Sequence, residues 1–390
     1  MDEYSQQFTE LRKFLAPEII YGPGAHLRVG QYAVNMGIHR VFVVTDEGVI
    51  KAGWTGQILQ ILEKMGLYYS LFSNLTPNPK DYEVMAGWKQ YHSDQCNGII
   101  VVGGGSSIDC AKGVGIIASH QGSILDYEGI DTLKTPCPPM ICIPTTAGSS
   151  ADVSQFAIIT DSQNRRKIAI ISKALVPDIS LISPETTMTL DSQQTAQTGM
   201  DALCHAIEAL VSNASSPVTD LFSLNAISLI SNHLSKAVNN LKDIKHRDPL
   251  MLASMEAGFA FSNASLGAVH AMAHALGGYS DANHGESNAL LLPHVIRFNF
   301  KSATDRYLRI GKAMDLDFIG KTQEQARDIL LNHLIQLTQE YGLNMKLSNL
   351  GYTLSDIPQL ARTAIKDPCL LTNPRPVSIG ELEELYAEAL

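Results

Sequence analysis

Histidines are concentrated in one short apolar stretch of the 390-residue chain, VHAMAHALGGYSDANHG at positions 269–285. His270 and His274 are four residues apart, so a helix would project both from one face, and His284 follows after two glycines at which the chain could turn back. A second stretch, TGMDALCHAIEALVS, places Asp201 and His205 at the same spacing. Imidazole and carboxylate groups gathered in this way are typical ligands of a divalent metal ion.

One such pair alone would be weak support for a metal site, because Asp and His four residues apart usually form a surface or capping pair. Five candidates in two otherwise apolar helical stretches favour a metal ion. Ligands without a thiolate suit Fe(II), Zn or Mn and do not choose among them. Four protein ligands fill a tetrahedron, whereas a catalytic ion keeps a position open. Either one of the five residues is not a ligand, or the ion accepts five or more ligands, as Fe(II) does.

A glycine-rich segment, GIIVVGGGSSIDCAKG, predicts a nucleotide-binding turn between a buried strand and a helix. Three successive glycines let the backbone approach a ligand closely, and the free N–H groups of a helix starting at Ser106 or Ser107 favour a phosphate. The segment matches neither the GxGxxG nor the P-loop pattern, so a tight turn without a ligand is the alternative. The candidate residues are Gly103, Gly104, Gly105, Ser106 and Asp109, the last in the first turn of the helix.

Two other segments are expected to end at the same edge of the sheet. Asp46 follows the strand RVFVV, where its carboxylate could accept hydrogen bonds from a ribose diol. An Asp in this place is, however, more often a helix cap. The segment PTTAGSSADVS offers neutral hydrogen-bond donors at Thr145, Thr146 and Ser149, although such residues often only form turns.

Several motifs together resemble the iron-containing alcohol dehydrogenase family: GGGSSID, PTTAG, TGMDALCHAIEA, FSNASLGAVHAMAHALGG and HGESNALLLPHV, in this order. The resemblance covers essentially the full length of the chain and implies a dinucleotide domain over a helical metal domain, with NAD in the cleft between them. It implies Asp201, His205, His270 and His284 as the metal ligands. His274 would then face the site without binding the ion.

The resemblance also implies contacts with the cofactor and the substrate. These are Asp46 at the adenosine ribose, Asn78, the turn from Gly103 to Ser106 at the pyrophosphate, Thr145, Thr146 and Lys167, with Phe261 lining the substrate channel. The chain departs from the family in two places. TTAGSSADV stands where the family often has TTAGTGSEV, so the acid is one carbon shorter at Asp152, which could change cofactor or substrate contacts. HALG stands where HPLG is frequent, which removes only a helix kink.

A dinucleotide beside a divalent ion predicts hydride transfer, in which the ion acts as a Lewis acid on the substrate oxygen and the nicotinamide carries the hydride. Proton exit could run through His274, unless it is a packed core histidine. Positions 187–235 and 248–296 contain no Lys or Arg, although these residues normally bind phosphate and carboxylate groups. We therefore expect an NAD-dependent alcohol dehydrogenase acting on a small neutral primary alcohol and its aldehyde.

Two other functions are compatible with the same motifs. A metal- and NAD-dependent cyclase or lyase of the dehydroquinate synthase kind shares the architecture, but its anionic substrate would need the basic residues just found missing. A non-catalytic binding protein on the same scaffold would not need intact candidate ligands.

The elements expected around these sites change in type near residue 187. Before it, apolar strands at 40–46, 68–72, 98–102 and 140–144 alternate with helices, which indicates a parallel sheet, and 156–171 looks like a hairpin. After it the chain is helical, with one helix expected to begin at Asp248 as cap and Pro249 in the first position. We predict an α/β plus all-α fold, dehydroquinate synthase-like in architecture. A Rossmann-like NAD-binding domain would span 1–187 and an all-helical metal-binding catalytic domain 188–390.

Composition excludes several classes of protein. The chain is 45% apolar and 17% charged with a net charge of −10 and no basic stripe, so neither disorder nor a nucleic-acid partner is expected. The apolar runs are too short to span a bilayer, and the first residues lack the apolar core of a signal peptide. Six cysteines without a CxxC pair fit reduced thiols. We expect a cytoplasmic homo-oligomer, a dimer or larger, without membrane contact.

Overall fold

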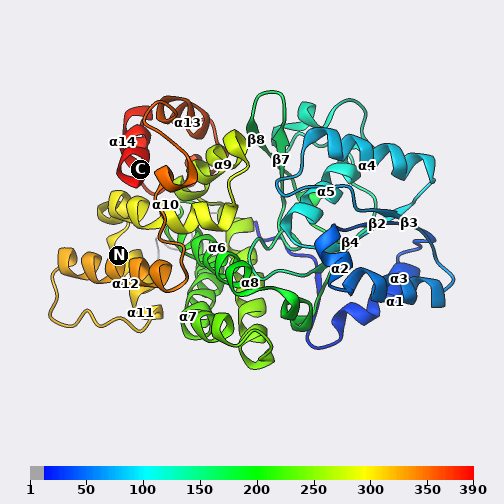
Figure 1. The fold of residues 1–390 in the computed structure, drawn as a ribbon, viewed down its shortest axis with the longest axis horizontal. Coiled ribbons are helices and arrows are strands. Elements are labelled where there is room, and N and C mark those ends of the chain that lie inside the picture. Colours follow the sequence, from blue (N-terminus) through cyan, green and yellow to red (C-terminus); the bar gives the residue numbers. More distant parts are fainter. Residues whose placement is uncertain (1–12) are drawn as a thin grey trace, which may run out of the picture.

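A six-stranded parallel sheet forms the centre of the N-terminal half, on the right in Figure 1, in the order β1-β9-β6-β4-β2-β3. The structure is a computed structural model that describes residues 13–390. The prediction that the chain begins without a signal peptide concerns residues outside that range. The strands are β1 Glu18–Tyr21, β2 Arg40–Val44, β3 Tyr68–Phe72, β4 Gly98–Gly103, β6 Met140–Pro144 and β9 Ile179–Ile182.

Helices cover both faces of this sheet, which is why its strands are apolar on both sides. Phe42 and Val44 of β2 pack in one core with the helices α4 and α5, whereas Val41 and Val43 pack in another with α1 and α3. This alternation follows from the two-residue period of a strand. The helices of this half are α1 Val29–Asn35, α2 Glu47–Lys51, α3 Trp54–Lys64, α4 Asp81–Ser93 and α5 Gly105–Ser119.

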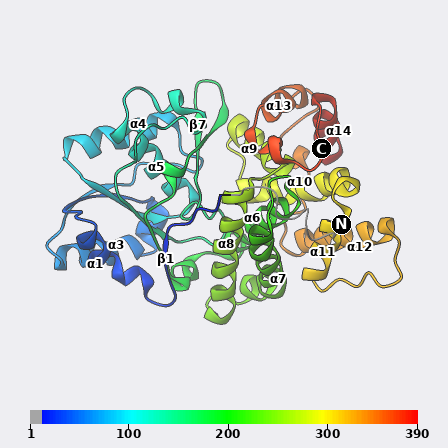
Figure 2. The same ribbon diagram turned by 180° about the vertical axis from the view of Figure 1, so that it is seen from behind.

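The predicted hairpin is present and lies at the junction of the two halves (Figures 1 and 2). Strands β7 Phe156–Asp161 and β8 Arg166–Ile171 pair antiparallel, and β5 Gly129–Ile130 adds a short parallel strand to β8. β7 packs against α5 of the N-terminal half, and β8 packs against helix α9 of the C-terminal half. The hairpin therefore connects the two candidate sites.

The C-terminal half is helical, with α6 at its centre against α7, α8 and α10. Helix α6 begins with a capping box, in which the Asp191 carboxylate accepts from the Gln194 N–H and the Gln194 side chain accepts from the Asp191 N–H. The helices are α6 Ser192–Val211, α7 Pro217–Asn239, α8 Ile244–Ala264, α9 Ala268–Ser280, α10 His284–Asn299, α11 Thr304–Ala313, α12 Gln323–Glu340, α13 Ile357–Ala364 and α14 Ile379–Ala389.

Two local predictions are wrong. Helix α8 begins at Ile244 with Asp243 as its cap, so Pro249 is its sixth residue instead of its first. A proline there removes the hydrogen bond to the Lys245 carbonyl and crowds that carbonyl, and the buried Arg247 guanidinium holds the preceding turn by donating to the Leu241 carbonyl.

Gly277 and Gly278 lie inside α9 and do not form a turn; the chain turns at Asp281, whose φ is 59°. Their role is close packing against the hairpin, because a Cβ on Gly278 would come within 2.5 Å of Arg166 Cα. A single sequence cannot distinguish a glycine needed for a turn from one needed for close approach.

The predicted fold class is confirmed: a Rossmann-like parallel-sheet half precedes a helical half. The last strand of the large sheet ends at Ile182 and the first long helix begins at Ser192, and the boundary at 187/188 stays a prediction. The six cysteines are free, as expected. None of the helices within residues 13–390 combines the length and apolar character that a bilayer crossing requires.

Candidate active site

A cleft of about 1010 Å³ lies between the two halves and brings both candidate sites together. Every predicted cofactor, metal and substrate residue lines it except Gly103, which ends β4 beneath the turn. The cleft follows from strand register: the carboxyl ends of parallel strands meet at one edge, where the Thr145 N–H donates to the Gly103 carbonyl.

The glycine turn joins β4 directly to α5. The helix begins at Gly105, one or two residues earlier than expected, so Asp109 lies just beyond the first turn. Side chains pack tightly against this turn, since a Cβ on Gly105 would lie 2.8 Å from Ser149 Oγ, and one on Gly104 would lie 3.1 Å from Thr146. The backbone and the Thr/Ser loop thus form one surface above the N-terminus of a 15-residue helix, a place that favours an anion.

Asp46 is the helix cap that was the alternative for this residue, and its place at the ribose stays a prediction. Its carboxylate accepts from the Val49 N–H at 3.0 Å and so caps α2, and its other oxygen accepts from Ser107 Oγ at 3.0 Å. The residue also lines the cleft. A helix cap and a cleft position are therefore compatible at this residue.

Asp109 and Lys167 are half-buried charged residues on the cofactor side of the cleft. Burial raises the pKa of Asp109 to about 7 and lowers the pKa of Lys167 to about 8. Lys167 lies against α9, where a Cβ on Gly277 would be 3.0 Å from its Nζ. Among the described residues that line the cleft, Lys167 is the only Lys or Arg.

Asn78 and Asp152 show how loops outside the turn are held. Asn78 has a positive φ of 55° and lies at the cleft, near Asp281 at the end of α9. Lys80, two residues later, forms an ion pair with Asp281, so this loop contacts the helical half.

Asp152 is buried and its carboxylate accepts a hydrogen bond from Ser180 Oγ at 2.6 Å, away from the cleft lining. The shorter acid of TTAGSSADV therefore makes a contact inside the fold.

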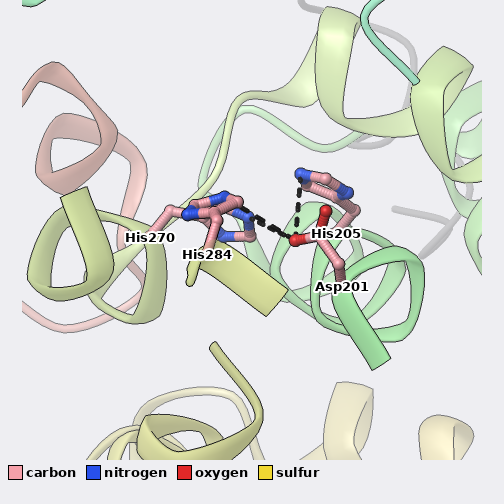
Figure 3. Close-up of side chains that lie close together, drawn as sticks. All are labelled: Asp201, His205, His270 and His284. Atoms are coloured by element: carbon pink, nitrogen blue, oxygen red, sulfur yellow. Dashed lines mark ion pairs between the residues drawn. The ribbon is translucent and has the colours of Figure 1, made fainter. Parts of the chain in front are cut away.

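Asp201, His205, His270 and His284 converge from α6, α9 and α10 (Figure 3). Asp201 Oδ1 lies 4.0, 3.9 and 3.6 Å from Nε2 of His205, His270 and His284. Ligands about 2.1 Å from a tetrahedral ion lie about 3.4 Å apart, so these separations fit a shared ion after small inward movements.

The protonation state of the histidines also fits a metal. Burial lowers the pKa of His205 to about 4 and that of His270 to about 3, and lowers the pKa of His284 as well. All three imidazoles are therefore neutral at pH 7 with lone pairs available. His270 Nδ1 lies 2.6 Å from Glu208 Oε2, so it donates to this carboxylate and leaves the Nε2 lone pair facing the cluster.

His274 and Phe261 lie beside the cluster. His274 Nδ1 lies 2.8 Å from an oxygen of Asp367, and its ring stacks on His284 at 5.3 Å between centroids. Because Nδ1 faces Asp367, the other ring nitrogen is the one available to the cleft. Phe261 stacks on His205 at 4.3 Å and forms an apolar wall of the cleft.

Three residues that contact the cluster or His274 were not predicted: Glu208, Asn288 and Asp367. Asn288 follows His284 by four residues, so helical spacing places it near that ligand, whereas Glu208 of α6 contacts His270 of α9, 62 residues further along the chain. Carboxylate and amide residues at such spacings are too common to single out. Asp367 lies 93 residues beyond His274, and only the tertiary fold joins them.

Comparisons with known proteins agree with this architecture. Residues 16–184 match the family described as iron-containing alcohol dehydrogenase, and residues 195–390 match the C-terminal part of the Fe-containing alcohol dehydrogenase family. The chain belongs to the iron-containing alcohol dehydrogenase family.

Relatives and solved structures extend over almost the whole length of this family member. It is 37% identical over 379 residues to 1,3-propanediol dehydrogenase of Citrobacter freundii, covering 96% of this chain and 98% of that protein. It is 38% identical over 371 residues to alcohol dehydrogenase 4 of Schizosaccharomyces pombe, covering 95% and 87%. The crystal structure of a 1,3-propanediol oxidoreductase superposes with a TM-score of 0.94 at 36% identity, covering 98% of this chain and 100% of that one.

Proposed function

We propose that the protein is a metal-dependent, NAD-linked alcohol dehydrogenase that interconverts a primary alcohol and its aldehyde by hydride transfer. The carrying observation is that one cleft contains both a glycine turn suited to a pyrophosphate and a cluster of one carboxylate and three neutral imidazoles. Membership in the family implies a divalent metal and NAD. Within that, we propose one Fe(II) ion, with Zn as the alternative, held by Asp201, His205, His270 and His284.

The chemistry divides between the bound groups and the chain. A divalent ion, when bound, polarises the substrate oxygen, and NAD accepts or donates the hydride. The chain binds the cofactor through the N-terminus of α5 and a set of side chains, and Phe261 excludes water from the substrate channel. The proposed cofactor residues are Asp46, Asn78, Gly103, Gly104, Gly105, Ser106, Asp109, Thr145, Thr146, Ser149 and Lys167.

His274 is proposed to move the proton that leaves the alcohol. Its Nδ1 is held by Asp367, and the histidine lines the cleft beside His284, so its Nε2 is placed to exchange a proton with substrate or water. The carboxylate of Asp367 fixes the tautomer, because it accepts a hydrogen bond from the Nδ1–H group.

A small neutral alcohol is the proposed substrate class. Phe156, Ile158, Phe261, Leu266 and Cys369 give the cleft an apolar lining near the cluster. A dehydroquinate synthase-like reaction would need several cations for its anionic substrate, whereas Lys167 is the only Lys or Arg among the described lining residues. The converging ligands oppose a non-catalytic binding role. The homo-oligomeric state and the cytoplasmic location stay predictions.

The test is NADH formation by purified, ion-loaded protein with a panel of alcohols that differ in length and charge. We expect turnover with short primary alcohols and little with phosphorylated or dicarboxylic ones. Turnover confined to anionic substrates would overturn the proposed substrate class, and no NAD-linked turnover with any alcohol would overturn the proposed reaction.

A further inference from the structure

The amide of Asn288 points into the metal cluster, although Asn288 is not one of the four proposed ligands. Asn288 is fully buried on α10, one turn after His284 and on the same face. Its Nδ2 lies 2.7 Å from Asp201 Oδ1, 3.1 Å from His270 Nε2 and 3.2 Å from His284 Nε2. One side-chain nitrogen therefore lies within hydrogen-bond distance of three of the four ligand atoms.

The chemistry of these three atoms requires the NH₂ end of the amide to face them. Asp201 is a carboxylate, and His270 donates from Nδ1 to Glu208, so its Nε2 carries a lone pair. His284 Nε2 lies 3.2 Å from the same amide nitrogen, and a histidine that binds an ion through Nε2 carries its proton on Nδ1, so this Nε2 presents a lone pair as well. An amide NH₂ has two hydrogens, and the three acceptors share them. The amide oxygen, on the other side, is buried without a hydrogen-bond partner among the described residues, so the nitrogen contacts determine its orientation.

Without an ion, the three ligand atoms present lone pairs to one another in a buried space. A donor among them satisfies these lone pairs and keeps the side chains convergent. An aliphatic side chain of similar volume could fill the space but could not donate. We propose that Asn288 is a positioning residue of the metal centre, whose amide holds Asp201, His270 and His284 converged for the ion. This inference rests on the proposed function, because it takes the cluster as the metal site.

Metal affinity is the quantity that this role changes. Residues that orient metal ligands typically contribute 10–100-fold to metal affinity. In Asn288→Ala we expect the affinity for Zn²⁺, measured by competition with a chromogenic chelator, to fall by about 10–100-fold. At saturating Zn²⁺ the four ligands are unchanged, so kcat should return close to the wild-type value while the Zn²⁺ concentration needed for half-activity rises.

Asn299→Ala is the matched control. Asn299 is an equally buried asparagine on the same helix, and its amide donates to Asn373, outside the cluster. It should lower thermal stability by an amount similar to Asn288→Ala and leave the Zn²⁺ affinity unchanged. Asn288→Asp tests the donor with almost no change in shape. A carboxylate cannot donate and repels Asp201, so the ion-free protein should melt at a lower temperature, and Zn²⁺ should raise its Tm by more than it raises that of the wild type.

Co²⁺ distinguishes positioning from direct ligation. The absorption bands of Co²⁺-loaded Asn288→Ala should match those of the wild type, with only the titration midpoint shifted. Different bands would make Asn288 a ligand and overturn the proposal. The proposal would also be overturned if Asn288→Ala bound Zn²⁺ with wild-type affinity and Zn²⁺ raised the Tm of Asn288→Asp only as much as that of the wild type. If the wild type itself turns over fully without any bound ion, the proposed function fails and this inference fails with it. If the wild type needs a bound ion but the Asn288 variants bind Zn²⁺ as the wild type does, the inference about Asn288 is contradicted while the proposed function stands.

Discussion

Gly285 controls how closely the helix that carries His284 approaches the helix that carries Asp201. A Cβ at position 285 would lie 2.3 Å from the Gln197 carbonyl oxygen and 2.8 Å from its carbon. Both contacts are with backbone of α6, four residues before Asp201, so no side-chain rotation relieves them. We therefore predict that Gly285→Ala damages the metal centre far more than it damages the fold.

The geometry gives the size of both effects. Ordinary carbon–oxygen contacts are about 3.3 Å or longer, so the start of α10 must move by about 1 Å. Overpacking of this kind costs about 1–3 kcal/mol, and Ala regains up to about 1 kcal/mol of helix propensity, so the free energy of unfolding falls by at most about 3 kcal/mol. A displacement of about 1 Å at His284 is large for a metal–ligand bond and can cost about 100-fold in rate.

The assays are Zn²⁺ affinity by chelator competition, kcat/KM for a short alcohol, and thermal melting. We expect at least about 10-fold weaker Zn²⁺ binding and about 100-fold lower kcat/KM in a variant that still folds. Gly56→Ala is the control, because Gly56 lies exposed on α3 with nothing within 4 Å of a built Cβ, and it should melt at or above the wild-type temperature. Wild-type Zn²⁺ affinity and turnover in Gly285→Ala would refute the argument that this close approach sets the position of His284.

Three other substitutions test separate parts of the site. Asp46→Gly keeps an acceptable helix cap but removes a carboxylate expected about 5 Å from the 2′-phosphate of NADP. The repulsion between these charges is worth roughly 3 kcal/mol, so kcat/KM with NADP should rise by about 100-fold or more. Equal use of NAD and NADP by the wild type would contradict the assignment of Asp46 to the ribose. Glu208→Gln weakens the hydrogen bond that orients His270 and should lower Zn²⁺ affinity by about 10-fold in chelator titrations; an unchanged titration would contradict it. His274→Ala should keep wild-type metal content by elemental analysis while kcat falls by about 10²-fold, and loss of the metal would instead make this histidine a ligand.

The sequence was most informative where chemistry and helical spacing coincide. Asp201 and His205, and His270 and His274, share helix faces within continuous helices, so their proximity could be predicted without tertiary information. The predicted strands of the large sheet have five or six residues each and are confirmed. The short strands β1 Glu18–Tyr21 and β9 Ile179–Ile182 were not predicted, since four residues carry little periodic signal and their pairing depends on the rest of the sheet.

The parts that could not be predicted depend on contacts between distant segments. Asp367 reaches His274 only because the chain returns to α9, and Asn288 gains meaning only when α6, α9 and α10 converge. Gly277 and Gly278 read as a turn in sequence but serve the approach of β8 to α9. Pro249 suggested a helix start, whereas a cap at Asp243 and the buried Arg247 moved the start one and a half turns earlier. In each case a tertiary contact outweighed a local preference.

The most direct test of the central claim is the rate of NADH formation from a short primary alcohol by one preparation in three states: as purified, stripped of metal, and reloaded with Fe(II) or Zn²⁺ under anaerobic conditions. Elemental analysis must accompany each state. The proposal predicts that turnover disappears in the stripped protein and returns in proportion to ion bound, up to one per chain. Full turnover by protein shown to be metal-free would contradict it.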